Sequence, residues 1–250
     1  TTSFTPSDDA LYDAATDETT IVSITNVAGG NALESGDQAV TLTIADNESA
    51  PTVTLNVSST STAENSGSSI SVTATLSNKS YQAITVGLPA TGADTTVISG
   101  TDYSVVSSIS IDANTSSAAV SFTPIDDISN PVYEENETVT LAISGITSGS
   151  ASLGATTSKT VTIIENETVP LITLSGTTSI DEKTPTATIT ATSSINADAN
   201  IVLTLVKSGE ATFSTDYSVS DITIVAGTTS EDTFLRPVSD TDYEGGSETV

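Results

Sequence analysis

Residues Phe122–Ser144 read FTPIDDISNPVYEENETVTLAIS, and this stretch decides the fold because the chain holds it in more than one copy. Related stretches are FTPSDDALYDAATDETTIVSIT at Phe4–Thr25 and FLRPVSDTDYEGGSETV at Phe234–Val250. Each copy contains acidic residues, then a Tyr, then a Glu-Thr pair. Self-similarity at a fixed period is the signature of repeat architectures. The sequence therefore predicts a chain of repeated modules.

A second landmark sets the period of the repeat. The segment IADNESAPTVTL at Ile44–Leu55 matches IIENETVPLITL at Ile163–Leu174, about 120 residues further along the chain. Boundaries near Pro51 and Pro170 predict the C-terminal part of one module at 1–49, a complete module at 50–169 and the N-terminal part of a third module at 170–250. We interpret the chain as a window from a longer array of modules of ordinary domain size.

The complete module has the residue pattern of β structure. Apolar residues alternate with Ser or Thr at Ile70, Val72, Ala74 and Leu76, which indicates a strand with one buried face. Seven strands are expected, at 52–57, 69–76, 83–88, 103–111, 117–124, 137–144 and 157–164. This pattern predicts an all-β fold of tandem immunoglobulin-like, seven-stranded antiparallel β-sandwiches. Another sandwich or a barrel is the alternative.

The charge of the chain narrows the range of its partners. It carries 32 acidic residues against five basic ones, a formal net charge of -27. Such a molecule repels phosphate backbones and anionic lipid, so no nucleic-acid partner is expected. No apolar run approaches the roughly 20 residues that span a bilayer, so no membrane span is predicted in this segment. Carboxylates at this density favour bound cations.

The acidic residues of the complete module gather at one end of the predicted sandwich. If successive strands run antiparallel, the loops after the first, third and fifth strands share one pole with the end of the seventh. Ten of the module's eleven acidic residues fall at that pole, and only Asp112 falls at the other. The ten are Glu64, Asp94, Asp102, Asp126, Asp127, Glu134, Glu135, Glu137, Glu165 and Glu167.

This acidic cluster has two interpretations. Surface loops are commonly acidic and solvated, which requires no ligand. A solvated surface would spread its acids over both poles, however, and neighbouring carboxylates repel by about 1 kcal/mol per close pair in water. Divalent cations remove that repulsion, and mixed carboxylate and carbonyl oxygens favour Ca²⁺ over Mg²⁺. The sequence therefore predicts Ca²⁺ as the cofactor.

Several motifs, taken in their order, resemble those of a known family. They are ENSG after the first strand, GTDY in the third loop, DD followed by YEENETV, and ENE after the seventh strand. With these motifs the chain resembles the Calx-beta family, which is known from calcium-binding regulatory domains of sodium/calcium exchangers and from large bacterial surface proteins. The resemblance covers essentially the whole chain and implies calcium-binding β-sandwich modules.

The resemblance also implies a set of metal ligands. In the complete module they are Glu64, Asp102, Asp126, Asp127, Glu134, Glu137, Glu165 and Glu167. The matching acids are Asp8, Asp9, Asp46 and Glu48 in the first partial module, and Glu182, Asp216, Asp240 and Glu244 in the third. The chain departs from the family where Asn166 interrupts an acidic triplet, which is expected to weaken or remove one ion, and where Ser239 replaces an Asp.

The sequence does not point to catalysis. The chain has no His and no Cys, which removes most nucleophilic and acid–base schemes. A glycosidase needs only two carboxylates, but the six Tyr and four Phe provide no evident aromatic platform for a sugar. We therefore expect no enzymatic activity.

The expected function is that of a calcium-binding tandem repeat segment in a secreted, extracellular cell-surface protein that is adhesive or forms filaments. Calcium is expected to stiffen the junctions between modules. The expected partners are calcium ions, neighbouring modules of the same chain, and other copies in a filament or a cell-surface ligand. A calcium-sensing pair of regulatory modules is the alternative. Micromolar or tighter affinity favours sensing, and near-millimolar affinity favours a structural role.

Overall fold

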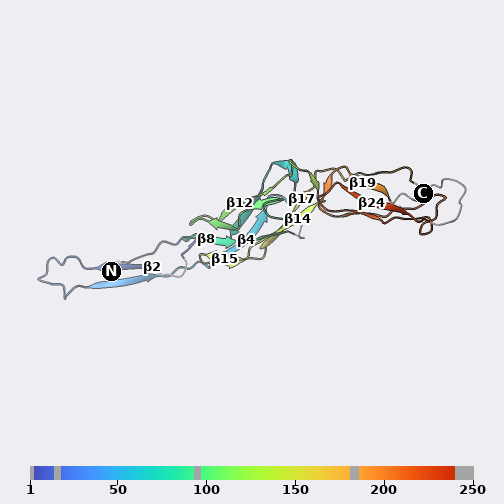
Figure 1. The fold of residues 1–250 in the computed structure, drawn as a ribbon. Helices are drawn as coiled ribbons and strands as arrows, with labels where there is room; N and C mark the ends of the chain where they lie inside the picture. The colour runs from blue at the N-terminus through green and yellow to red at the C-terminus, as the bar shows by residue number, and fades with distance from the viewer. Residues whose placement is uncertain (1–2, 14–17, 93–96, 181–185, 240–250) are drawn as a thin grey trace. The chain divides into compact units, whose positions relative to one another are not determined.

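The computed structural model describes residues 3–13, 18–92, 97–180 and 186–239 (Figure 1). Within these ranges the regular structure is almost entirely β, and the exception is a single 3-10 helix, η1 (Glu64–Ser66). The predicted all-β class is therefore confirmed. No helix in the same ranges is long and apolar enough to span a membrane.

Spatial contacts divide the chain into two compact units, and each is described by itself. The first unit consists of 1–62, 66–124 and 138–162, and the second consists of 63–65, 125–137 and 163–250. These units follow contacts in space, whereas the predicted boundaries near residues 49 and 169 follow the sequence repeat. The module boundaries therefore stay a prediction.

Three sheets are formed by the segment expected to be the complete module. The order in a five-stranded sheet is β10 (Tyr103–Val105), β12 (Ser117–Pro124), β6 (Ile70–Leu76), β4 (Thr52–Val57) and β16 (Ser152–Leu153). A three-stranded sheet has the order β11 (Ser108–Ile111), β8 (Ile84–Gly87) and β15 (Gly145–Ser148). A four-stranded sheet has the order β5 (Ser61–Ala63), β17 (Ser158–Ile164), β14 (Glu137–Ala142) and β9 (Ala90–Gly92).

Alternating side chains build the core of these sheets. In β6, Ile70, Val72, Ala74 and Leu76 are buried, while the Ser and Thr residues between them are more exposed. The same period of two recurs at the start of β14. Burying a Leu or Ile side chain contributes about 1.5–3 kcal/mol, so this face holds the strands together. The predicted buried face of β6 is confirmed.

The strands of the structure differ from the prediction at several places. The stretch 103–111 was expected as a single strand, whereas the structure has β10 and β11 separated by Val106 and Ser107. Strand β10 pairs with β12 and β11 pairs with β8, so the chain changes sheets at this break. Strands β15 and β16 were not predicted, because the segment from Gly145 to Leu153 is rich in Ser and Gly and lacks clear alternation.

Related strands lie outside that segment. Strands β2 (Glu18–Ser23) and β3 (Ala39–Ile44) form an antiparallel pair in the first unit. The second unit has a sheet of β18 (Ile172–Gly176), β19 (Ala187–Ser193), β24 (Ser230–Pro237) and β22 (Tyr217–Ser218), and a pair of β21 (Ile201–Leu203) with β23 (Ile222–Ile224). Ile172 faces Ser193 as Val53 faces Leu76, so the register of β18 with β19 repeats that of β4 with β6.

Two short parallel pairs complete the structure. In the first unit, β1 (Leu11–Tyr12) pairs with β7 (Lys79–Ser80). In the second unit, β13 (Val132–Tyr133) pairs with β20 (Asn196–Ala197). Each pair joins a segment just after a double Asp to the turn that follows the second strand of the next sequence repeat.

Candidate metal centre

Glu64 is a buried carboxylic acid at the start of η1, directly after β5. Only 6% of the residue is exposed. The charges that act most strongly on it are those of other acids, led by Glu165 and Glu134. A carboxylate that leaves water is costly unless an opposite charge or a metal accompanies it. This position therefore suits a bound cation.

Asp126 and Asp127 follow β12 and place oxygens next to Glu64. Asp127 Oδ2 accepts a hydrogen bond from the N–H of Val132 at 2.5 Å. The other oxygen of Asp127 and Oδ1 of Asp126 are buried without a hydrogen-bond partner in the part of the chain that the structure describes. Most buried polar atoms have such a partner, so these two oxygens fit a metal ligand role.

Glu165 and Glu167 follow β17, and hydrogen bonds fix both carboxylates. Glu165 Oε2 accepts the N–H of Glu134 at 2.5 Å, and Glu165 Oε1 accepts the N–H of Glu167 at 2.6 Å. Glu167 Oε2 is buried and has no hydrogen-bond partner among the described residues. One oxygen of this second pair of acids is thus also suited to a cation.

These carboxylates meet in two groups of three that share Glu64. One oxygen each from Glu64, Asp126 and Asp127 lie within 4.8 Å of one another, and the same holds for Glu64, Glu165 and Glu167. All five residues belong to the second unit. Calcium–oxygen distances are about 2.3–2.6 Å, so three oxygens at this separation can contact one ion. The arrangement fits two cations bridged by Glu64.

Burial and mutual repulsion set the pKa values in this centre. Burial raises the pKa of Glu64 to about 8, and the charges of Glu165, Glu134, Asp127 and Glu167 add to the effect. Burial, together with the hydrogen bond to Glu165, raises the pKa of Glu167 to about 7. Burial also raises the pKa of Asp127. For Glu165, burial opposes ionisation, but hydrogen bonds from Glu167 and from backbone N–H groups outweigh it and lower the pKa.

No basic side chain neutralises the centre within the described ranges. The single ion pair among the described residues joins Lys207 Nζ to Asp221 Oδ1 at 3.3 Å, and neither residue belongs to the centre. Repulsion among the carboxylates is therefore relieved only by protonation or by a bound cation.

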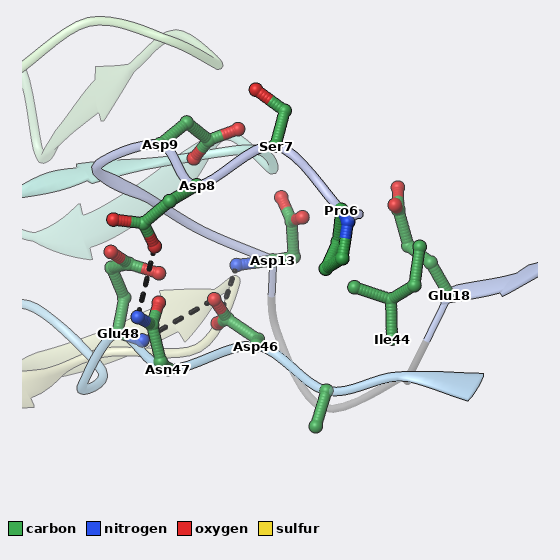
Figure 2. Close-up of a pocket in the computed structure, with 11 residues that line it drawn as sticks. Pro6, Ser7, Asp8, Asp9, Asp13, Glu18, Ile44, Asp46, Asn47 and Glu48 are labelled. Carbon is green, nitrogen blue, oxygen red and sulfur yellow. Dashed lines mark hydrogen bonds between the residues drawn. The ribbon is translucent and has the colours of Figure 1, made fainter. Parts of the chain in front are cut away.

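Figure 2 shows the matching acids of the first partial module, which line a pocket in the first unit. The lining acids are Asp8, Asp9, Asp13, Glu18, Asp46 and Glu48. Asp46 Oδ2 accepts the N–H of Asp13 at 3.0 Å, and Asn47 Nδ2 donates to Asp8 Oδ1 at 3.0 Å. Among the described residues, no three of these carboxylates come within 4.8 Å of one another. The pocket is acidic but less convergent than the Glu64 centre.

Asp102 and Asp216 occupy the same position in two copies of a Thr-Asp-Tyr turn. Asp102 is buried, and its Oδ2 accepts the backbone N–H of Ile98. Asp216 Oδ2 accepts the backbone N–H of Thr212 at 2.5 Å. Each carboxylate therefore closes its own turn, which the sequence did not lead us to expect. Metal binding by these two residues stays a prediction.

Of the remaining predicted ligands, Glu134 and Glu137 place one oxygen each within 4.8 Å of one another, and others lie outside the described ranges. Glu137 opens β14 and is 6% exposed, whereas Glu134 is half-buried. Glu135, between them, has a φ of 59°, in the left-handed region that costs a non-glycine residue about 1–2 kcal/mol. Strained backbone of this kind clusters at functional loops. Three predicted ligands lie outside the described residues, namely Glu182, Asp240 and Glu244.

Three asparagines connect the loops that carry the carboxylates, and the sequence interpretation did not assign them this role. Asn166 Oδ1 accepts the N–H of Asn65 at 3.2 Å, and Asn166 Nδ2 donates to Glu167 Oε1 at 2.8 Å. Asn136 Oδ1 accepts the N–H of Glu165 at 3.0 Å. A signal was present, because the motifs ENSG, EENE and ENE each contain an Asn. Asn166 interrupts an acidic triplet, but it also links two of the loops that carry ligands.

No family model matches this chain, and no curated protein matches it. The Calx-beta resemblance therefore stays an interpretation of motifs and their order. The geometry and chemistry of the carboxylate centre are therefore the best guide to function.

Proposed function

We propose that this chain is a calcium-binding tandem repeat segment of an extracellular surface protein that is adhesive or forms filaments. In this proposal its modules are immunoglobulin-like, seven-stranded β-sandwiches of the Calx-beta type, which bind and connect but do not catalyse. The observation that carries the proposal is the burial of the Glu64 carboxylic acid at a position shared by two groups of three acids. Calcium at this position stiffens the junction to the next module.

The donor atoms of the centre suit calcium. Its side chains offer hard oxygen ligands, and the chain has neither the thiolates nor the imidazoles that select softer metals. Calcium accepts six to eight oxygens in flexible geometry, whereas magnesium requires a near-ideal octahedron and gives up its waters reluctantly. Irregular loops that carry carboxylate, amide and backbone oxygens fit the calcium requirement better.

The position of the centre supports a role at module junctions. Asp127 accepts the N–H of Val132, the first residue of β13, and β13 pairs with β20 of the following repeat. The acidic loop is thus joined to the next module by backbone pairing as well as by covalent connection. An ion that orders the loop also orders the strand that makes this junction.

Calorimetric titration of the 250-residue chain with CaCl₂ tests the proposal, together with melting curves in calcium and in chelator. We expect at least two ions, near-millimolar dissociation constants and a raised melting temperature, because ligand at 100 times Kd stabilises the folded state by about 2.7 kcal/mol. MgCl₂ is the matched comparison and should bind more weakly. Micromolar affinity would instead favour calcium sensing. No heat of binding and an unchanged melting temperature would contradict the proposal.

A further inference from the structure

The short parallel pair of β13 with β20 has defined contacts. Val132 faces Asn196 and Tyr133 faces Ala197 in the register. The backbone N–H of Asp198 donates to the carbonyl oxygen of Tyr133 at 3.2 Å. These contacts lie within the second unit. The pairing therefore connects the acidic loop of one repeat to a turn of the next through main-chain atoms.

The same connection occurs a second time, at the preceding repeat. Within the first unit, Leu11 faces Lys79 and Tyr12 faces Ser80, and the N–H of Tyr81 donates to the carbonyl oxygen of Tyr12 at 2.9 Å. The turn sequences are Lys-Ser-Tyr in one copy and Asn-Ala-Asp in the other. Different side chains in the same register indicate that the backbone makes the connection.

Strand β13 has carboxylates of the centre on its other side. The N–H of Val132 donates to Asp127, which belongs to one group of three acids, and the N–H of Glu134 donates to Glu165, which belongs to the other. Residues two apart in an extended chain point their N–H groups in the same direction, and the residue between them points the opposite way. Tyr133, between these two donors, is the residue whose carbonyl meets the next repeat.

We infer that the turn 196–198 of the following repeat is part of the machinery of the Glu64 centre. Its pairing with β13 fixes the two amide donors that hold Asp127 and Glu165, so cation binding and docking of the turn strengthen one another. Coupling between two sites is reciprocal, so docking raises calcium affinity by the factor by which calcium favours docking. This inference rests on the proposed calcium function.

The test compares three variants of the full chain by calcium titration. Asp198→Pro removes the N–H that donates to Tyr133, and its calcium affinity should fall by about fivefold or more, the lower end of usual coupling between sites. Asp198→Asn removes the charge but keeps the N–H, so its calcium affinity should fall less than that of Asp198→Pro. Tyr81→Pro removes the matching donor at the other junction and should leave the Glu64 centre unchanged.

Amide hydrogen exchange in the unmodified chain provides a second readout that needs no variant to fold. Calcium should slow hydrogen exchange at the Asp198 amide several-fold. It should change the exchange rate of the Tyr81 amide much less. Equal calcium affinity in Asp198→Pro and the unmodified chain, or unchanged exchange at Asp198, would overturn the inference while leaving the calcium function intact. Absence of calcium binding by the unmodified chain would remove the proposed function and the inference with it.

Discussion

The Glu64 centre of the complete module and the acidic pocket of the first partial module have similar acids but different geometry. In the first, two groups of three oxygens lie within 4.8 Å of one another. In the second, Asp8, Asp13 and Asp46 line one pocket, and among the described residues they form no such group. The acids that follow the later strands of a repeat are therefore not sufficient to make a convergent site.

Glu64 accounts for the difference. It comes from the turn after β5, an early element of the repeat, and it belongs to both groups of three acids. The pocket of the first partial module contains no counterpart of Glu64 among its lining residues. A central acid from a distant part of the chain thus converts two neighbouring pairs of acids into one centre.

The burial of equivalent apolar side chains also differs between copies of the repeat. Leu141 in β14 is fully buried, while Val22, which occupies the matching position in β2, is 54% exposed. In the second unit, Leu174 is 57% exposed and its counterpart Leu55 only 2%. The compared residues are equivalent in the sequence repeat, so the elements packed on a strand decide whether its apolar side chains contribute stability.

The largest expected effect comes from truncating equivalent core positions. Leu141→Ala should destabilise the chain by about 2–5 kcal/mol, because it removes a fully buried side chain and leaves a cavity. Val22→Ala should change stability by no more than about 0.5 kcal/mol, as is usual at the surface. Urea unfolding followed by circular dichroism measures both, and similar losses in the two variants would contradict the comparison.

The next effect is the pH dependence of the metal-free chain. The pKa of Glu64 is raised from 4.5 to about 8 and that of Glu167 to about 7 in the folded state. Between about pH 4.5 and 8 the folded centre thus holds protons that the unfolded chain has released, so the free energy of unfolding should fall as pH rises.

Urea unfolding in chelator at several pH values within that window measures this slope. Glu64→Gln is the matched control, because it cannot ionise at the central position and should make the slope flatter. In saturating calcium the fall with pH should disappear, since the ion binds the deprotonated acids. Stability that rises with pH in chelator, or an unchanged slope in Glu64→Gln, would show that the centre does not govern the pH response.

The sequence predicted well those strands whose apolar and polar residues follow a clear local pattern. Strands β4 and β12 have the expected bounds because apolar and polar residues alternate through them. The break between β10 and β11 was missed, because a change of pairing partner leaves no mark on alternation.

The candidate site shows a similar division. Glu64, Asp126, Asp127, Glu165 and Glu167 were placed at one pole by strand order, and the structure brings them together. The motifs contain Asn65, Asn136 and Asn166, but the partners of these asparagines could not be predicted, because the contacts depend on the distance between loops that are remote in sequence. Strand order sets which loops meet, and three-dimensional packing sets which atoms touch.

The smallest expected effect concerns two copies of one turn. Gly100 and Ser214 have φ values of 94° and 74°, and each donates its N–H to the carbonyl of a Tyr three residues later at 2.7 Å. Only glycine adopts such a φ without cost, so Ser214→Gly should stabilise the second unit by about 1 kcal/mol, and Gly100→Ser should destabilise the first by a similar amount. Urea unfolding measures both shifts, and changes of the opposite sign would contradict this reading of the turns.

The most direct test of the account is calcium titration of Glu64→Gln beside Asp112→Asn in the full chain. Both variants remove one negative charge, but Asp112 is exposed and lies outside the acidic pole. We predict that Glu64→Gln weakens calcium binding at both groups of three acids, with affinity at least about tenfold lower. Each group loses one charged carboxylate ligand, which calcium prefers. Asp112→Asn should bind as the unmodified chain does. Equal binding by Glu64→Gln and the unmodified chain would contradict the claim that a shared, buried carboxylate organises a calcium centre.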